Sequence, residues 1–86
     1  MKELEKIFKA FANKRRLAIL AYLKRSGEAT VGDIAAEIKL SFKSTSKHLY
    51  VLAAADIIEK DQRGPQVFYQ LTPNPRSSVR QLIDLI

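Results

Sequence analysis

The sequence contains no cysteine in its 86 residues. This absence excludes a disulfide framework, a thiolate metal site and a thiol redox sensor, and it indicates a reducing, cytoplasmic environment. Histidine is scarce too, since His48 is the only one. A lone imidazole without a cysteine or a second histidine cannot assemble the usual zinc ligand set, so we expect no bound metal.

Long hydrophobic runs are also missing. The segment MKELEKIFKAF at the start alternates charged and apolar side chains, and it therefore matches neither a signal peptide nor a membrane span. The sequence has no glycine-rich phosphate loop, no nucleophile beside a base in a motif, and no paired-carboxylate motif. We therefore expect a soluble cytoplasmic protein that is not an enzyme and binds no cofactor.

Acidic side chains are outnumbered. Fifteen lysines and arginines stand against nine aspartates and glutamates, which gives a formal net charge of +6 and a pI near 9.8. Such a balance favours an anionic partner such as nucleic acid. A domain of this length hides only about 60 to 65% of the surface that its unfolded chain exposes, so a partner subunit would help to stabilise it.

Hydrophobic spacing predicts a pair of helices in the first third of the chain. The first spans residues 2–12, and its apolar stripe consists of Leu4, Ile7, Phe8 and Phe11. Asn13 offers a capping oxygen for the second helix, which Ser26 and Gly27 end. Its apolar residues are Leu17, Ile19, Leu20 and Leu23.

Two shorter helices follow with about three residues between them. Thr30 and Asp33 resemble a capping box at the start of a helix over residues 31–38. Ser41 can cap the next helix, which continues to Ala55 and whose apolar stripe is Thr45, Leu49 and Leu52. The short connection predicts a helix-turn-helix over residues 31–55.

Two β-prone segments, IIEKD and VFYQL, then flank a polar turn that contains Gly64 and Pro65. They predict a two-stranded hairpin over residues 57–72 with Arg63 at its tip. After TPNP breaks the chain, Ser77 or Ser78 is expected to cap a last helix over residues 77–86. The predicted fold is mainly α with a small β-hairpin: one winged helix-turn-helix domain over residues 1–86, with five helices and a two-stranded wing.

Three segments carry a resemblance to a known family. They are IFKAFANKRRLAILAYL, then ATVGDIAAEIKLSFKSTSKHLYVLAAADII, and VFYQLT at the end of the wing. Over residues 4–72, in register and without gaps, the chain resembles the ArsR type of bacterial and archaeal transcriptional regulators. This resemblance implies a DNA-binding regulator in which the helix with SFKSTSKHLYVL is the recognition helix.

The helix after Ser41 has a cationic face that points away from its apolar stripe. Residues 39–50 carry three lysines and no acid, whereas charges elsewhere are mixed. Such a face suits the major groove, although a solvated cationic helix is the alternative. We expect groove contacts from Lys43, Ser44, Ser46 and Lys47, and contacts to the DNA backbone or through the wing from His48, Tyr50 and Arg63. For Arg63, a freely solvated turn arginine is the alternative.

Several positions depart from the family pattern. Phe42 stands where a polar residue such as glutamine is frequent, and it either packs at the edge of the core, which we favour, or contacts a thymine methyl group. Asp56 stands where glycine is usual, at a helix exit that tends to need a left-handed backbone. Thr30 and Gly32 occupy the places of the family's paired cysteines, and the last helix offers only Asp84, so the resemblance implies no metal site.

Lys14, Arg15 and Arg16 form a cationic cluster where the second helix starts, and such a cluster can hold a phosphate. In the family pattern the arginine at Arg16 is structural, so we do not expect it to read bases.

The first and last helices have apolar stripes that a small core cannot readily cover, and an exposed stripe marks a subunit interface. We expect a two-fold dimer through Leu4, Ile7, Phe8, Phe11, Val79, Leu82 and Ile83. The alternative is that the first helix only covers the chain's own core.

Taken together, these features predict a homodimeric repressor that binds double-stranded DNA at an imperfect palindrome and senses no metal. The alternatives are a winged helix for protein contacts and a nonspecific nucleic-acid-coating protein. The sequence identifies no small-molecule effector.

Overall fold

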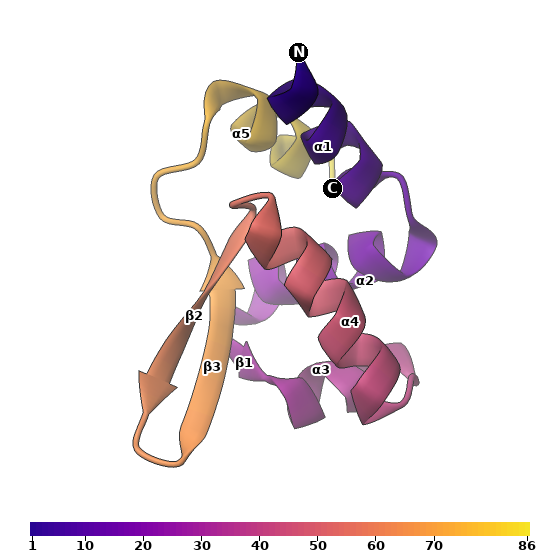
Figure 1. Ribbon diagram of the computed structural model, residues 1–86. Helices are drawn as coiled ribbons and strands as arrows, with labels where there is room; N and C mark the ends of the chain where they lie inside the picture. The colour runs from indigo at the N-terminus through magenta and orange to yellow at the C-terminus, as the bar shows by residue number, and fades with distance from the viewer.

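The chain folds into five helices and a small antiparallel sheet, and the computed structural model describes all residues 1–86 (Figure 1). In chain order the elements are α1 Lys2–Phe11, α2 Lys14–Ser26, β1 Ala29–Thr30, α3 Val31–Ile38, α4 Phe42–Ala54, β2 Ile58–Arg63, β3 Gln66–Leu71 and α5 Ser77–Asp84. The predicted winged helix-turn-helix is confirmed. None of these helices combines the length and the hydropathy that crossing a membrane requires.

The start of α2 is capped as predicted. Asn13 Oδ1 accepts hydrogen bonds from the backbone N–H groups of Arg15 at 2.9 Å and Arg16 at 3.1 Å. These bonds satisfy two donors that the helix itself leaves unpaired. Gly27 ends the helix with a φ of 87°, which a glycine adopts without steric cost.

The helix-turn-helix pair also begins at predicted caps. Thr30 and Asp33 form a reciprocal capping box at α3, and Ser41 Oγ accepts a hydrogen bond from the Ser44 N–H at 3.1 Å at α4. The turn between them was harder to predict, because Lys39 ends α3 in the left-handed conformation with a φ of 57°. Glycine or asparagine is the usual sequence signal for that conformation, and a lysine gives none.

The wing has one more strand than the sequence predicted. β1 pairs with β3 through Ala29 opposite Tyr69 and Thr30 opposite Phe68, so the strand order is β1-β3-β2 with β3 in the centre. A strand of two residues is too short to show an alternating pattern, which is why the prediction contained only the hairpin. The extra pairing attaches the middle of β3 to the segment that leads into α3.

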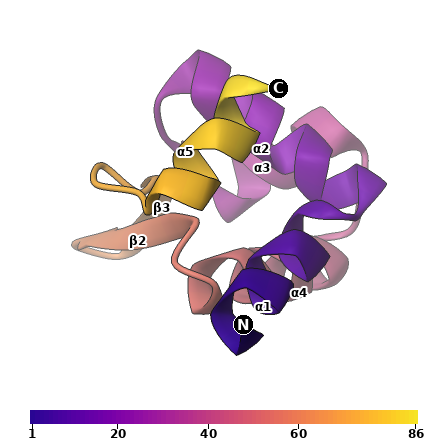
Figure 2. The ribbon, with the colours of Figure 1, turned by 90° about the horizontal axis from the view of Figure 1, so that it is seen from above.

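The hydrophobic core draws buried side chains from all five helices and from the first two strands. Ile7, Phe11 and Val79 belong to this core and are 2, 6 and 1% exposed. α1 contacts α5, and Figure 2 shows both helices over the helix-turn-helix body. The expectation that these three side chains lie exposed for a partner is therefore wrong, because the end helices use them to cover their own core. Leu4, Leu82 and Ile83 are partly exposed and Phe8 is 50% exposed.

Two smaller predictions concern chain breaks. Asp56 has a φ of 57°, so the left-handed backbone expected after α4 is confirmed. The serine cap of α5 is wrong: Arg76 occupies the N-cap position without a side-chain cap, and Ser77 Oγ accepts a hydrogen bond from Gln81 Nε2 at 3.2 Å. Ser77 lies inside the first turn, and its hydrogen bond with Gln81 joins two side chains one turn apart on the same face of the helix.

Thr45 lies fully buried on the inner face of α4, and its hydroxyl has no hydrogen-bond partner. Leaving such a group unpaired costs about 1–3 kcal/mol. The isosteric Thr45→Val change is therefore expected to raise the free energy of unfolding by about 1 kcal/mol, measured by urea denaturation. Thr45→Ser, which keeps the hydroxyl and loses the methyl group, should lower it. A valine variant no more stable than the wild type would show that the Thr45 hydroxyl is not an unpaired group that costs stability.

Candidate nucleic-acid interface

The outer face of α4 is exposed to solvent. Lys43, Lys47 and Tyr50 lie on it one helical turn apart, and Tyr50 is 76% exposed. Ser44 and Ser46 are half-buried at its edges. Phe42 is 63% exposed at the start of the helix, so the favoured interpretation that it packs at the core edge is wrong. Its ring faces solvent because Thr45, Leu49 and Leu52 already fill the inner face.

Carboxylates are absent from this helix and its approaches. Between Glu37 and Asp56 the chain contains no acid, while Lys39, Lys43 and Lys47 recur every four residues. Residues four apart lie on the same side of a helix, so Lys43 and Lys47 add their charges on one face. The outer face of α4 therefore carries two lysines and no acid.

The wing divides its charges between its two faces. Alternate residues of a strand point to opposite sides of the sheet. Lys60 points to the side where α4 lies, and it lines a crevice of about 480 Å³ between α4 and the wing together with Ser46, Tyr50 and Tyr69. Glu59, Asp61 and Arg63 occupy the opposite face. In β3, Tyr69 pairs with Lys60 and lies on the face toward α4, whereas Phe68 pairs with Asp61 and lies on the opposite face. The wing thus presents a lysine beside α4 and holds its acids on the opposite face.

Lys60 was not among the residues predicted from the sequence. The strand alternation could have indicated it, because residues two apart in a strand lie on the same face and Ile58 is buried on the face toward α4. The turn and its arginine gave the more conspicuous signal.

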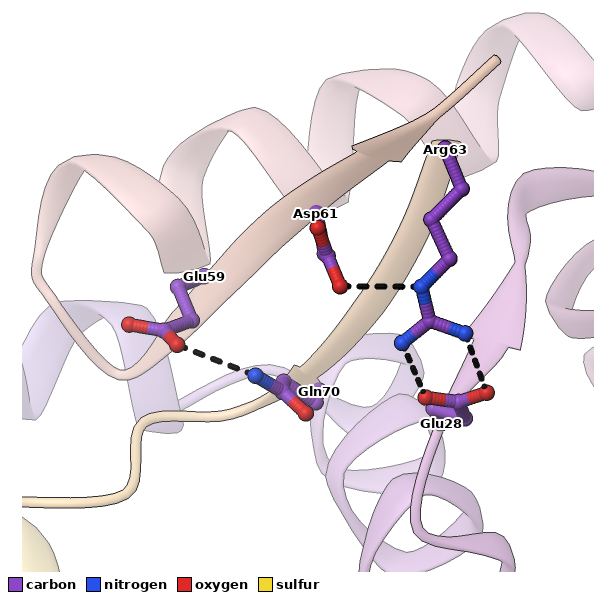
Figure 3. A network of polar contacts seen from close by, with 5 residues as sticks. All are labelled: Glu28, Glu59, Asp61, Arg63 and Gln70. Atoms are coloured by element: carbon purple, nitrogen blue, oxygen red, sulfur yellow. Dashed lines mark hydrogen bonds and ion pairs between the residues drawn. The ribbon is translucent and has the colours of Figure 1, made fainter. Parts of the chain in front are cut away.

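Arg63 does not extend from the wing tip. Its Nη1 and Nη2 donate to the two carboxylate oxygens of Glu28 at 2.9 and 2.7 Å, and its Nε donates to Asp61 at 2.9 Å (Figure 3). Its guanidinium also lies 4.5 Å from the centre of the Phe68 ring. The hydrogen bond from Arg63 lowers the pKa of Glu28, and the hydrogen bonds to Glu28 and then Asp61 raise the pKa of Arg63. Each of the three guanidinium nitrogens of Arg63 donates to a carboxylate, so this side chain is not the freely solvated turn arginine of the alternative, and its contact with DNA stays a prediction.

Glu28 joins Arg63 of the wing to the body of the domain. This residue directly precedes β1, 35 positions before Arg63. Glu59 and Gln70 make a further cross-strand contact on the same wing face, with Gln70 Nε2 donating to Glu59 at 3.0 Å. Arg63 therefore positions the wing against the body of the domain.

Arg16 is a structural arginine, as the family pattern implied. Its Nε donates to the Ala10 carbonyl at 2.7 Å, its Nη2 to the Lys9 carbonyl at 3.0 Å, and its Nη1 lies 3.2 Å from His48 Nδ1. The first two oxygens belong to the last turn of α1, where helix carbonyls lack partners. One side chain thus joins α1, α2 and α4. Arg15 is exposed and makes only a 3.5 Å contact to the Ile38 carbonyl.

His48 is half-buried behind the outer face of α4. Because the Arg16 guanidinium can only donate, His48 Nδ1 accepts, and the neutral ring carries its proton on Nε2. Burial, followed by the charges of Arg16 and Arg15, lowers the pKa of His48. The histidine is therefore a neutral partner of Arg16.

This arrangement predicts a loss of stability in mild acid. The pKa of His48 is lower in the folded chain than in the unfolded chain, where it is about 6.5. The stability that the neutral ring contributes is therefore fully present above pH 6.5, and it is lost as the pH falls through the pKa of the folded chain. Urea denaturation should give a lower free energy of unfolding at pH 5.5 than at pH 7.5. His48→Gln should reduce this difference. An unchanged difference in the variant would assign the loss to other groups.

The positions that carry the family's paired cysteines serve another purpose here. Thr30 Oγ1 accepts the capping hydrogen bond from the Asp33 N–H at 3.2 Å, and a side chain at Gly32 would meet only Thr30. The structure brings together no group of three histidine, cysteine or acidic side chains that could hold a metal ion.

A family model described as "Bacterial regulatory protein, arsR family" matches residues 13–60, from the Asn13 cap to the first half of β2. Among curated proteins, the transcriptional repressor SdpR of Bacillus subtilis (strain 168) is 35% identical over 81 residues, covering 93% of this chain and 89% of SdpR. The transcriptional activator HlyU of Vibrio cholerae is 32% identical over 80 residues, covering 93% of this chain and 70% of HlyU.

Solved structures show the same arrangement of helices and wing. HlyU from Vibrio cholerae superposes with a TM-score of 0.83 at 31% identity, covering 98% of this chain and 87% of the HlyU chain. The homodimeric winged helix-turn-helix DNA-binding domain of Mb0332 from Mycobacterium bovis superposes with a TM-score of 0.84 at 27% identity, covering 98% of this chain and 74% of that one.

Proposed function

The chain belongs to the ArsR family of bacterial regulatory proteins, and we propose that it is a homodimeric repressor that binds a specific, imperfectly palindromic DNA duplex. Its relatives are DNA-binding transcriptional regulators and not enzymes. The SdpR relative supports repression, because that protein is named a repressor and aligns with nearly the whole chain.

The observation that carries the proposal is the charge arrangement around α4. Lys43 and Lys47 project from a helix without acids, and Lys60 adds a cation from the wing across the adjoining crevice. Lysines bind phosphates and donate to acceptors on base edges in the major groove. We assign Lys43, Ser44, Ser46 and Lys47 to groove contact and Tyr50 and Lys60 to the flanking backbone.

The proposed dimer uses the outer side of α1. Met1, Leu4, Phe8 and Ala12 line a mainly apolar hollow of about 640 Å³ there, together with Lys2, Glu5 and Lys9. It lies next to the partly exposed Leu82 and Ile83 of the contacting α5. The homodimeric Mb0332 domain supports this assembly, because it shares the fold across 98% of the chain. A two-fold dimer would direct its two recognition helices to half-sites about one turn of DNA apart.

Selection of bound duplexes from a random pool tests the specific DNA-binding proposal. We expect the wild type to enrich an imperfect palindrome, and the Lys43→Ala/Lys47→Ala variant to lose that enrichment. Lys24→Ala, which removes one cation near the C-terminus, should retain it. Steep salt dependence without an enriched motif would indicate nonspecific coating, and no duplex binding at all would indicate a protein-contact module. Either result would overturn the proposal.

A promoter that carries the enriched motif tests repression. Adding the protein to purified polymerase in a transcription assay should reduce transcript in proportion to occupancy. Increased transcript would assign activation instead.

The two wing cations are expected to behave differently. Lys60→Gln should reduce the slope of log affinity against log salt by about 0.9 for each phosphate that the variant no longer neutralises. Arg63→Gln should leave this slope nearly unchanged, because the Arg63 side chain already binds Glu28 and Asp61. Filter binding of the enriched duplex at several salt concentrations measures both. A larger effect at Arg63 would show that the ion pairs open when DNA binds.

A further inference from the structure

α1 carries a row of lysines that runs along the border of its apolar hollow, because Lys2 and Lys9 line that hollow as well. Lys2, Lys6 and Lys9 recur at i, i+4 and i+7, which aligns them along one side of the helix. Lys9 lies 3.8 Å from the Glu5 carboxylate, with both side chains well exposed. Lys2 and Lys6 have no carboxylate within 4.0 Å. Apart from the Lys9–Glu5 pair, these lysines form no ion pair within the chain.

The lysine row borders α4. Lys2, Lys6 and Lys9, together with Arg16 and Glu5, line a crevice of about 430 Å³ whose other wall is Tyr50, Val51 and Ala54. Figure 2 shows α1 and α4 next to each other on one side of the molecule, with the C-terminus on the far side. Arg16 is committed to carbonyls of α1, and Glu5 is the only acid in the crevice. The remaining charge is strongly positive.

This crevice is continuous with the candidate interface. Tyr50 and Ala54 line both the α1 crevice and the crevice between α4 and the wing. The outer face of α4 is therefore a ridge between two hollows, with Lys60 across one and the α1 lysines across the other. A polyanion lying along α4 would meet cations on both sides of the ridge.

We propose that Lys2, Lys6 and Lys9 bind phosphates of the DNA backbone next to the segment that α4 reads. The inference rests on the proposed DNA-binding function and extends its footprint to α1. Lysine is a flexible point charge that binds phosphate without a fixed geometry, so this row contributes affinity and not sequence preference. Because Lys2 and Lys9 also line the hollow of the proposed dimer face, the rows of both protomers would lie at the edge of the dimer interface, between the two half-sites.

The test compares the Lys2→Gln/Lys6→Gln/Lys9→Gln variant with the wild type on the enriched duplex and on a random duplex. The salt slope should fall by about 0.9 for each phosphate left without its lysine, or by about 5 if all six lysines of a dimer contribute. Affinity for both duplexes should fall by a similar factor of at least about ten, with the preferred sequence unchanged. Circular dichroism and light scattering confirm that fold and assembly are retained.

A matched control removes three cations around α5 and the C-terminus, through Lys24→Gln/Arg76→Gln/Arg80→Gln. This control should keep the wild-type slope. Equal slopes for the wild type and the α1 variant would overturn the proposal, and so would a changed preferred sequence. If the wild type binds no duplex, the proposed function itself fails, and that result is distinct because it appears before any variant is compared.

Discussion

Replacing Arg16 with alanine is expected to lower the free energy of unfolding by about 3 kcal/mol. The change removes donors from the Ala10 and Lys9 carbonyls and from His48 Nδ1. A hydrogen bond from a charged group is worth about 1.5–3 kcal/mol, and partial exposure together with replacement water reduces the sum. Since a domain of this size has a stability of only about 5–15 kcal/mol, the loss is a large fraction of the total. Urea denaturation measures it.

Two variants separate geometry from charge. Arg16→Lys keeps the charge but cannot reach three acceptors with a planar fork, so it should recover only a minor part of the loss. Arg15→Ala removes an exposed neighbour with one long contact, and its effect should stay within about 0.5 kcal/mol. Similar losses for Arg15 and Arg16 would show that net charge at the start of α2 matters more than the bonds.

The second large effect is expected at Phe8, whose ring is 50% exposed in the apolar hollow of α1. Phe8→Glu would remove the largest apolar side chain of the hollow and bury a carboxylate in the proposed dimer interface, a cost that Lys2 and Lys9 at the same hollow offset only in part. The dissociation constant of the dimer should rise by at least about 100-fold, which corresponds to about 2.7 kcal/mol. Sedimentation or light scattering across a concentration series measures the change, and affinity for the palindrome should fall with it.

Phe42→Glu is the matched control, because it introduces the same change at an exposed phenylalanine on α4. It should remain dimeric. A Phe8→Glu protein that is as dimeric as the wild type would exclude this face of α1 from the interface. A wild type that is monomeric at high micromolar concentration would exclude the dimer altogether.

The elements that could be predicted from the sequence are those with local signals. The helix starts at Asn13, Thr30 and Ser41 follow from short side chains that cap the backbone two or three residues ahead. The left-handed backbone at Asp56 followed from the family pattern, which has glycine there. A cap forms between residues that are neighbours in the sequence, so a short stretch of sequence is enough to predict it.

The features that could not be predicted from the sequence depend mostly on contacts between distant segments. Arg63 is held by Glu28, and no local pattern at the wing indicates that pairing. Ile7 and Val79 have amphipathic spacing that fits an interface or a core equally well, and only the contact of α1 with α5 decides between them. The core-edge place favoured for Phe42 is wrong for a different reason: single exposed apolar side chains are common on protein surfaces, and no local pattern distinguishes them from core residues.

The two-faced wing has a consequence for the approach to DNA. Glu28, Glu59 and Asp61 lie on one side of the hairpin, while Lys60 and the lysines of α4 lie on the other. Even with Arg63 among these acids, this separation leaves an electric dipole across the wing of the unbound domain. A polyanion repels the acidic side and attracts the basic one, so the domain is turned toward the productive orientation before contact. Diffusional encounters then include fewer misaligned collisions, and association becomes faster at low ionic strength.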